Sequence, residues 1–415
     1  MSPHASSAGC APFAEIRLDG SAPATARGAA REARLPAFIG LAEPAGPRLD
    51  ALRAMVIGCG SVGANLVLHL ARLHVAELWL VDPARLKPES LLTHPLEPEG
   101  IGRPKVDHFG RMAKGISPTT RVRAFAGPVQ SLPLPAFDRV DAVLMATDNL
   151  LAEVCTGERA VMFRKPLWQA SVHGETMVAQ VRFWRNDDGS GPCPACGFGP
   201  AEWDHVNRQT TFSCGGNGHH PTQVTTAPTM SVSFLCAISA EMAMVQFLRH
   251  VLGLGATSGD SVLEYCGYKT QVSSSPLVRN RACRCEHVAW DRVGVDGPIP
   301  PMSLREIAQR AGFDGPTPPD DLAFLVDELT FVELVVCCGV PQPVRRFCRA
   351  EAAAVARCSR CGKALRPQPF FSHRPTPAAV LASLVDEPLQ RLGAEAAEWV
   401  CVRSGGRNVF FRQEV

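Results

Sequence analysis

Short apolar runs alternate with segments of helical periodicity between residues 50 and 190. The runs that predict buried strands lie at residues 52–58, 77–82, 140–148, 166–172 and 176–184. The segments in which apolar side chains recur at helical spacing lie at residues 64–74 and 150–164. Because strands that alternate with helices form βαβ units, this pattern predicts an α/β domain built on a parallel sheet.

The flanking segments have different patterns. The first fifty residues are rich in Ala, Pro and Gly, with one short expected strand at residues 14–20. Residues 225–253 form the longest expected helix, and its almost wholly apolar character predicts burial inside the domain or at an interface. Residues 298–308 are expected to be a linker. The predicted organisation is an N-terminal extension, an α/β domain and a small partner-docking C-terminal domain, at residues 1–50, 51–294 and 295–415.

Composition narrows the class of protein. The 46% hydrophobic content indicates a folded chain, and 42 basic against 40 acidic residues exclude the strong positive field of a nucleic-acid binder. No apolar run approaches the roughly 18 to 20 residues that span a bilayer, and the first twenty residues lack a signal-peptide pattern. We therefore expect a cytoplasmic protein without a membrane partner, in which the 16 cysteines are mostly reduced.

A glycine motif follows the first expected strand. Gly58, Gly60 and Gly63, with Ser61 between them, have the G-x-G-x-x-G spacing that permits a tight turn and close approach of backbone to phosphate. Asp82 ends the next strand, where a carboxylate can accept a hydrogen bond from a ribose hydroxyl. These features fit NAD and ATP equally well, and a turn without a ligand is the alternative.

Three charged residues favour ATP. Lys105 and Arg103 begin an expected helix, from which they can reach phosphates, whereas a redox cofactor needs no such lysine. A solvated basic helix start is the alternative for both. Asp148 ends a buried strand, where a carboxylate suits Mg²⁺, and a helix N-cap is its alternative role.

These motifs resemble those of the ThiF/MoeB/HesA superfamily, which includes the adenylating half of ubiquitin-activating enzymes. The resemblance covers about residues 50–290 and is carried by "VIGCGSVGANLVLHLARLHVAELWLVD", "GRPKVD", "ATDN", "KPLWQASVHGETMVAQVRFW" and "CPACGF". It implies a Rossmann-like, doubly wound, mainly parallel sheet that binds ATP and Mg²⁺, and a homodimer that adenylates the C-terminal glycine of a ubiquitin-like protein. By position it implies that Asp82 holds the ribose, Lys105 the phosphates and Asp148 the Mg²⁺.

The chain also departs from the superfamily pattern. An acid, an Asn and an Arg that usually contact ATP are replaced here by Ala84, Ser90 and Thr93. The Arg-containing N-terminal helix that many members lend across the dimer is not evident either. Compensation by Arg103 or by an arginine of the partner subunit is one expectation, and weakened adenylation is the other.

The resemblance also assigns a structural Zn²⁺ site. Cys193 and Cys196 form a Cys-x-x-Cys pair, and Cys283 and Cys285 lie where the superfamily places the second pair, so four thiolates would close a tetrahedron. The Cys-x-Cys spacing of the second pair strains the usual turn, which leaves His287 as an alternative to Cys285. Buried cysteines without a metal are the third possibility.

Cys214 has the surroundings of a reactive thiol. It lies in a glycine-rich polar segment with His219 and His220 close enough in sequence to lower its pKa. Its position matches the loop cysteine that superfamily members use for thioester or persulfide chemistry. We expect a nucleophile, with a spectator thiol or a zinc ligand as the alternatives.

The C-terminal segment contains a further group of cysteines. Cys358 and Cys361 resemble a zinc-ribbon knuckle, but the adjacent Cys337 and Cys338 do not form a Cys-x-x-Cys turn. Cys348 lies between the two pairs. A second Zn²⁺ is therefore left open.

The combined prediction is a ubiquitin-activating-type enzyme. It would adenylate a ubiquitin-like protein with MgATP, form a thioester on Cys214 and pass the acyl group to a ubiquitin-conjugating-type enzyme. A sulfur-carrier adenylyltransferase for cofactor biosynthesis is the nearest alternative. A nucleotide-binding scaffold without catalysis is another, because Ser90 and Thr93 replace ATP-contacting residues.

Overall fold

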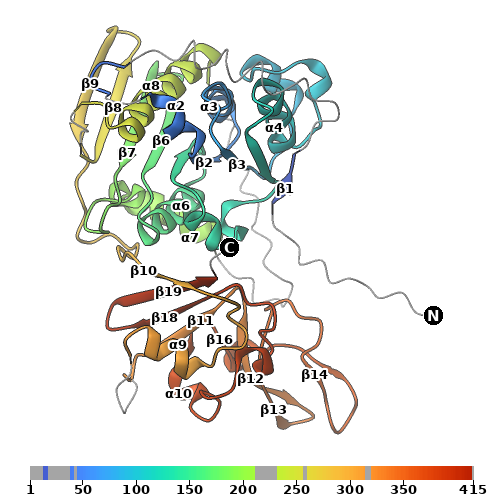
Figure 1. Ribbon diagram of the computed structural model, residues 1–415. Helices are drawn as coiled ribbons and strands as arrows, with labels where there is room; N and C mark the ends of the chain where they lie inside the picture. Colours follow the sequence, from blue (N-terminus) through green and yellow to red (C-terminus); the bar gives the residue numbers. More distant parts are fainter. Residues whose placement is uncertain are drawn as a thin grey trace. The chain divides into compact units, whose positions relative to one another are not determined.

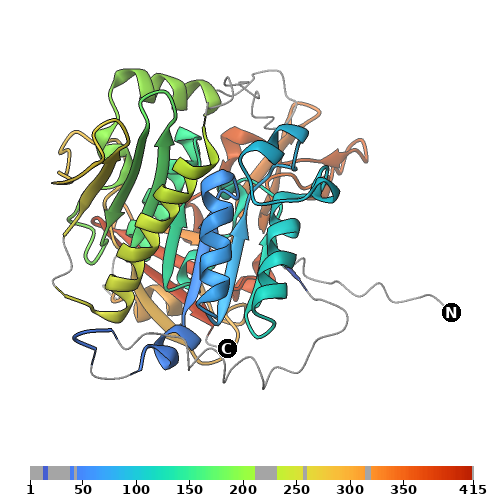
Figure 2. The same cartoon turned by 90° about the horizontal axis from the view of Figure 1, so that it is seen from above.

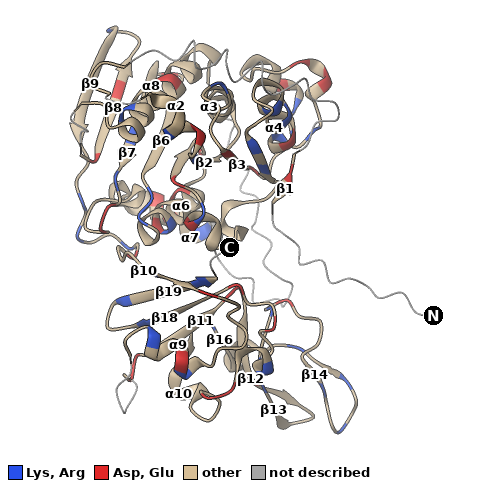
Figure 3. Cartoon of the chain, in the orientation of Figure 1, with Lys and Arg blue, Asp and Glu red and all other residues tan. Residues whose placement is uncertain are grey.

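The computed structural model describes residues 13–16, 38–41, 44–210, 231–255, 259–313 and 319–413. The chain forms two compact units, of which one contains the described residues as far as His287 and the other those from Val288 onward (Figure 1). Basic and acidic residues are interspersed over both units (Figure 3), in keeping with the net charge of +2.

A nine-stranded sheet forms the centre of the first unit, in the order β1-β4-β3-β2-β5-β6-β7-β8-β9. Strands β4, β3, β2, β5 and β6 are parallel, and the outer strands are antiparallel. The strands are β1 (Ala14–Glu15), β2 (Arg53–Ile57), β3 (Glu77–Val81), β4 (Arg121–Phe125), β5 (Ala142–Met145), β6 (Leu167–His173), β7 (Val178–Trp184), β8 (Ser261–Cys266) and β9 (Gln271–Pro276). The doubly wound, mainly parallel fold is thereby confirmed.

Helices cover both faces of this sheet. On one face, α8 (Ser233–Leu252), α3 (Ser61–Arg72) and α4 (Lys105–Ile116) lie side by side (Figure 2). The opposite face carries α6 (Leu150–Met162) (Figure 1). The central strands are covered on both faces, which explains why β2, β3 and β5 are continuous apolar runs. The other α-helices of this unit are α2 (Ala45–Asp50), α5 (Pro135–Asp138) and α7 (Pro200–Thr210).

Helix α8 is a core helix of this unit. Leu235 and Phe247 are fully buried in the main core. The hydroxyl of Ser239 donates hydrogen bonds to the carbonyl oxygens of Ser171 on β6 and Gln180 on β7. Among the described residues, α8 is also the one helix long and apolar enough to cross a membrane by length and composition alone, so the expectation that no segment approaches that length was wrong. The expected burial holds for one face of α8, whereas Phe234 and Val245 are exposed.

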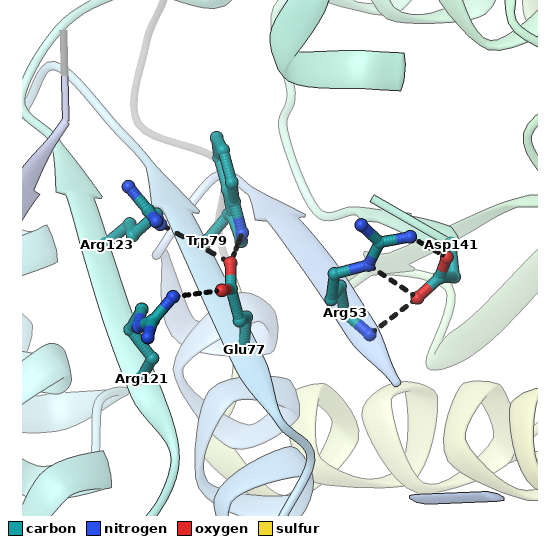
Figure 4. A network of polar contacts seen from close by, with 6 residues as sticks. All are labelled: Arg53, Glu77, Trp79, Arg121, Arg123 and Asp141. Atoms are coloured by element: carbon teal, nitrogen blue, oxygen red, sulfur yellow. Dashed lines mark hydrogen bonds and ion pairs between the residues drawn. The ribbon is translucent and has the colours of Figure 1, made fainter. Parts of the chain in front are cut away.

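Charged pairs tie the amino-terminal ends of the central strands together (Figure 4). Asp141, just before β5, accepts hydrogen bonds from the backbone N–H of Arg53 at 2.8 Å and from its guanidinium group at 2.7 and 3.1 Å. Glu77 on β3 accepts from Arg121 on β4 at 2.8 Å and from the indole of Trp79 at 2.9 Å. These pairs set the relative positions of β2 to β5 at the edge opposite the glycine motif.

The described residues of the second unit form three sheets. Their strand orders are β10-β19-β18-β11-β17, β13-β12-β16 and β14-β15. The strands are β10 (Asp291–Val295), β11 (Ala323–Val326), β12 (Thr330–Cys337), β13 (Val340–Cys348), β14 (Ala356–Arg357), β15 (Ala364–Leu365), β16 (Ser372–His373), β17 (Thr376–Pro377), β18 (Trp399–Ser404) and β19 (Arg407–Gln413). Although β10 precedes the expected boundary at residue 295, it pairs in parallel with β19 and so belongs to the sheet of this unit.

The segment expected to be a linker is part of this second unit. Helix α9 (Leu304–Arg310) begins within it, and Ser303 caps the helix by accepting a 3.2 Å hydrogen bond from the backbone N–H of Glu306. Leu304 and Ile307 are fully buried in the core of this unit. The linker interpretation was therefore wrong, because the prolines before the helix do not prevent a short amphipathic helix from packing.

Candidate functional site

The candidate site lies where the strand order reverses. Strands β3 and β4 follow on one side of β2, whereas β5 and β6 lie on its other side. Open α/β sheets bind ligands outside the carboxyl ends of the strands at such a point. The backbone N–H of Gly58 donates to Val81 at 2.8 Å, and that of Ala146 donates to Ile57 at 2.8 Å. These bonds bring the loops that follow β2, β3 and β5 together at one edge.

The three glycines of the motif have different structural roles. Gly58 has a φ of +87°, and a Cβ there would lie 2.5 Å from the carbonyl oxygen of Ala146. A Cβ on Gly63 would lie 1.8 Å from the carbonyl oxygen of Gly58, so this residue allows helix and loop to pack closely. A Cβ on Gly60, the N-cap of α3, would meet no atom within 4 Å. The space beside Gly60 is therefore open to a phosphate at a helix N-terminus.

Asp82 organises the glycine loop. Its side chain is 6% exposed, and its oxygens accept 2.7 Å hydrogen bonds from the backbone N–H groups of Cys59 and Ala84. Burial raises the pKa of this carboxyl, while the charge of Lys105 and the two hydrogen bonds oppose that rise. Each oxygen keeps a second lone pair, so a ribose hydroxyl can still donate to it. The loop-organising role was not expected from the sequence.

Lys105 and Arg103 act electrostatically on different residues: Lys105 on Asp82 and Cys59, and Arg103 on His108. The first residue of α4 is Lys105, whose backbone N–H donates to Ala84 at 3.0 Å. Its charge opposes the rise in the pKa of Asp82 and also acts on the buried thiol of Cys59. Arg103 is exposed, and its charge lowers the pKa of His108. Lys105 therefore lies close enough to Asp82 for its charge to act on that carboxyl group.

Asp148 follows β5, which pairs with β2 on the side opposite β3. It is exposed, and its charge raises the pKa of both Asp82 and Glu153. The N-cap of α6 is Asn149, whose side chain accepts a 2.9 Å hydrogen bond from the backbone N–H of Ala152. The helix N-cap, which was the alternative role for Asp148, is therefore provided by Asn149.

The residues that depart from the superfamily pattern build the loop after β3. The hydroxyl of Ser90 is buried and accepts a 3.1 Å hydrogen bond from the backbone N–H of Lys87. The hydroxyl of Thr93 lies 3.0 Å from Nδ1 of His94. Burial lowers the pKa of His94 from 6.5 to about 4, and the charge of Lys105 adds to this effect. His94 is therefore a neutral neighbour of Lys105.

Glu153 on α6 is a site neighbour that the sequence analysis missed. Its side chain is 6% exposed. Burial raises its pKa from 4.5 to about 7, with Gln169 and Arg182 opposing the rise and Asp148 adding to it. The available signal in the sequence was a glutamate among the apolar residues at the start of the expected helix. Helical periodicity alone did not show that the side chain of Glu153 is buried.

Three of the predicted zinc ligands come together with His287. The ligand atoms of Cys193, Cys196, Cys283 and His287 all lie within 4.8 Å of one another. The Cys193 sulfur is 3.9 Å from that of Cys196 and 3.8 Å from that of Cys283. Zn–S bonds of about 2.3 Å in a tetrahedron place sulfurs about 3.8 Å apart, so these separations fit one Zn²⁺.

The fourth ligand atom of this group, among the described residues, belongs to His287. Nδ1 of His287 donates to the carbonyl oxygen of Gly191 at 3.1 Å, which leaves Nε2 to face the Cys196 sulfur at 3.6 Å. Cys285 is also buried, and its thiol interacts with the thiol of Cys193 and with the carboxyl group of Glu158 on α6. The set of four cysteines and the alternative set with His287 both remain predictions, and the set with His287 is the one whose ligand atoms are mutually close.

Cys214, the expected nucleophile, lies outside the described residues, as do His219 and His220. Their arrangement therefore adds nothing to the geometry of the site. The described part of the site consists of the glycine loop, Asp82, Lys105 and Asp148.

The sequence of this chain is similar to those of known adenylyltransferases over part of its length. Residues 31–287 match the model of the ThiF family. Adenylyltransferase and sulfurtransferase uba4 of Aspergillus niger is 29% identical over 157 residues, which are 36% of this chain and 33% of the relative. The probable adenylyltransferase/sulfurtransferase MoeZ of Mycobacterium tuberculosis is 30% identical over 149 residues, which are 35% of this chain and 37% of the relative. The chain spans about a third of the length of the curated relatives it matches.

Solved structures are similar over a larger part of the chain. Escherichia coli MccB with ATP has 13% identity and a TM-score of 0.45, and the match covers 58% of this chain and 68% of MccB. The PaaA structure has 15% identity and a TM-score of 0.41, with 56% of this chain and 66% of PaaA covered.

Proposed function

Because the chain belongs to the ThiF family, we propose that it uses ATP to adenylate the C-terminal carboxylate of a ubiquitin-like or sulfur-carrier protein that ends in glycine. One observation carries this proposal. Lys105 and the buried Asp82 flank the glycine loop at the strand-order reversal, where Gly60 leaves open space at the N-terminus of α3. A fixed cation beside an open phosphate cradle suits adenylyl transfer, because charge on the phosphates increases as the reaction proceeds.

Different residues of the chain would bind the phosphates, the ribose and the Mg²⁺ during adenylation. The partner's carboxylate oxygen attacks the α-phosphorus, the bond to the bridging oxygen of pyrophosphate breaks, and an acyl adenylate forms. The backbone beside Gly60 and the ammonium of Lys105 would bind the phosphates, and Asp82 would accept from the ribose. When Mg²⁺ is bound, Asp148 would hold it, and the ion would neutralise charge on the leaving pyrophosphate.

The second step of the proposal involves Cys214. Its thiolate would attack the adenylate, release AMP and form a thioester, from which a ubiquitin-conjugating-type enzyme would accept the acyl group. The alternative is transfer of sulfur from a sulfur donor to the acyl adenylate, which releases AMP and leaves a thiocarboxylate. The names of uba4 and MoeZ support this alternative as much as the thioester step. We place the enzyme in the cytoplasm as a homodimer. Arg103 or an arginine supplied by the partner subunit would replace the missing ATP contact.

Pyrophosphate exchange tests the first step. The full chain is incubated with ATP, Mg²⁺, labelled pyrophosphate and candidate partners that end in Gly-Gly, and label in ATP is measured. Lys105→Ala is expected to reduce kcat/KM by about 10²- to 10³-fold. The control is Lys269→Ala, since Lys269 is exposed in the turn between β8 and β9. Nucleotide binding without exchange for any partner would support the scaffold reading instead.

The product formed from the acyl adenylate distinguishes the thioester step from the sulfur-carrier alternative. A reducible protein–protein thioester that disappears in Cys214→Ala supports conjugation. Efficient thiocarboxylate formation by Cys214→Ala, in the presence of a sulfur donor, supports the sulfur-carrier alternative and contradicts the thioester step.

A further inference from the structure

The second unit contains a compact cluster of four cysteines that the proposed function does not use. Cys337 and Cys338 lie at the turn between β12 and β13, and Cys358 and Cys361 lie between β14 and β15. All four sulfur atoms are within 4.8 Å of one another. The Cys337 sulfur is 3.9 Å from that of Cys338 and 3.7 Å from that of Cys361. These distances match the edge of about 3.8 Å expected for a tetrahedral Zn–thiolate site.

A left-handed turn allows two adjacent cysteines to contribute. Cys337 pairs with Val340 across the hairpin, so Cys338 and Gly339 form a two-residue turn. Their φ angles are +55° and +71°, as a type I′ hairpin turn requires. The turn reverses the chain directly after Cys337, which brings the Cys338 sulfur back beside it. This hairpin turn lets adjacent cysteines contribute two sulfurs without a Cys-x-x-Cys turn.

The other two cysteines lie in a knuckle that is already folded. The carbonyl oxygen of Cys358 accepts from the backbone N–H of Gly362 at 2.9 Å, and the N–H of Cys358 donates to Lys363 at 2.9 Å. The backbone N–H groups of Arg360 and Cys361 donate to the Cys358 sulfur. Such N–H groups around a sulfur orient a thiolate ligand and stabilise its charge.

The surroundings of the cluster fit a charged four-thiolate site. One Zn²⁺ and four thiolates carry a net charge of −2, and the exposed Arg357, Arg360 and Lys363 lie in the same knuckle. The guanidinium of Arg357 also donates to the carbonyl oxygen of Gly362 at 3.2 Å. The charge of the site would thus be compensated by residues of its own loop.

The hairpin that holds the knuckle is small. Strands β14 and β15 contain two residues each and, in the part of the chain that the structure describes, form a sheet of their own. The buried residues of the core beneath them are Val332, Val335, Cys358 and Leu365. An isolated two-stranded hairpin is marginal in water, and small cores of this kind are commonly stabilised by a metal or a disulfide.

We propose that Cys337, Cys338, Cys358 and Cys361 bind one Zn²⁺ in a closed structural site that joins the β14–β15 knuckle to the turn between β12 and β13. Binding replaces four thiol protons with the ion, and the four sulfurs fill every position of the tetrahedron. No position remains for a substrate, so the site stabilises the second unit and takes no part in the adenylation chemistry. An all-thiolate donor set favours Zn²⁺ over the hard ion Mg²⁺.

Metal content of the full chain tests the assignment. After dialysis against metal-free buffer, elemental analysis of the wild-type chain is expected to find about two zinc ions per chain, one in each cysteine group. Cys358→Ser is expected to lose about one of them. Cys348→Ser is the matched control, because Cys348 packs against the same small core but is not one of the four clustered cysteines. It is expected to keep both ions.

A measurement on the wild-type chain does not depend on how the variants fold. Purified chain is alkylated after denaturation without reductant, and the cysteines are identified by mass spectrometry. All four cysteines are expected to be alkylated, because zinc-bound thiolates are released as thiols. A disulfide within the cluster would overturn the proposal, as would one zinc per wild-type chain that Cys358→Ser retains, or iron in place of zinc.

Discussion

Oδ2 of Asp82 accepts a 2.7 Å hydrogen bond from the backbone N–H of Cys59, which joins the carboxyl end of β3 to the glycine loop after β2. Its other oxygen accepts a 2.7 Å hydrogen bond from the backbone N–H of Ala84. A side chain proposed to bind the ribose thus also holds the loop proposed to bind the phosphates. Nucleotide affinity and loop order should therefore change together when this residue is altered.

Asp82→Asn is expected to raise the KM for ATP in pyrophosphate exchange. The amide has one acceptor oxygen, so one of the two backbone N–H groups loses its partner, at a cost of about 1–3 kcal/mol. Asp141→Asn is the matched control, because Asp141 accepts from the backbone N–H of Arg53 at the opposite edge of the sheet. It should change the stability of the chain and leave the KM for ATP unaltered. Equal KM values for Asp82→Asn and wild type would contradict the ribose role.

Gly60→Ala is expected to impair ATP binding, whereas Gly63→Ala is expected to impair folding. A Cβ on Gly60 meets no protein atom within 4 Å, so Gly60→Ala should unfold like wild type but bind ATP more weakly. A Cβ on Gly63 would lie 1.8 Å from the carbonyl oxygen of Gly58, so Gly63→Ala should lower the free energy of unfolding. Thermal unfolding and nucleotide titration measure the two effects. Unimpaired ATP binding by Gly60→Ala would argue against phosphates at this loop.

His287→Ala is expected to lower the zinc content of the site in the first unit, whereas Cys285→Ser is expected to preserve it. Nε2 of His287 faces the Cys196 sulfur at 3.6 Å, while the thiol of Cys285 contacts Glu158. Elemental analysis measures the content, and His287→Cys tests whether a fourth thiolate restores it. Loss of zinc from Cys285→Ser with retention in His287→Ala would return the site to four cysteines.

Glu153→Gln is expected to flatten the pH dependence of stability. Burial raises the pKa of Glu153 from 4.5 to about 7, so the folded chain favours the protonated acid. The resulting stability is fully present below the unfolded pKa of 4.5 and is lost as the pH rises through about 7. Between about pH 5.5 and about pH 8.5 the wild-type chain should lose about 2 kcal/mol through this group, and the variant should not.

Urea unfolding at the two pH values measures this difference. Glu175→Gln provides the control, because Glu175 is exposed between β6 and β7 and its replacement should leave the wild-type slope intact. An equally steep loss of stability in Glu153→Gln would show that other groups cause it.

Local patterns were sufficient for most of the first unit. The apolar runs at residues 52–58, 77–82 and 140–148 contain β2, β3 and β5, because strands covered on both faces need apolar side chains at every position. The glycine spacing was equally informative, since the turn it permits depends on adjacent residues. The fold class and the placement of the glycine loop after a strand followed from such short-range rules.

Contacts between distant segments were less accessible from the sequence. The helix that begins within residues 298–308 was missed because its burial depends on a core formed by strands far along the chain. The burial of Glu153 likewise depends on β6 and β7, which helical periodicity does not include.

The sequence by itself determined the βαβ order, the glycine loop and the candidate charged residues, because each follows from spacing along the chain. Only the tertiary structure decided that Asp82 joins two loops, that His287 lies within the first cysteine group, and that Cys337 and Cys338 meet the knuckle at Cys358. These outcomes depend on where side chains point after the chain has folded back on itself. Spacing limits the partners that a residue can reach, and packing selects among them.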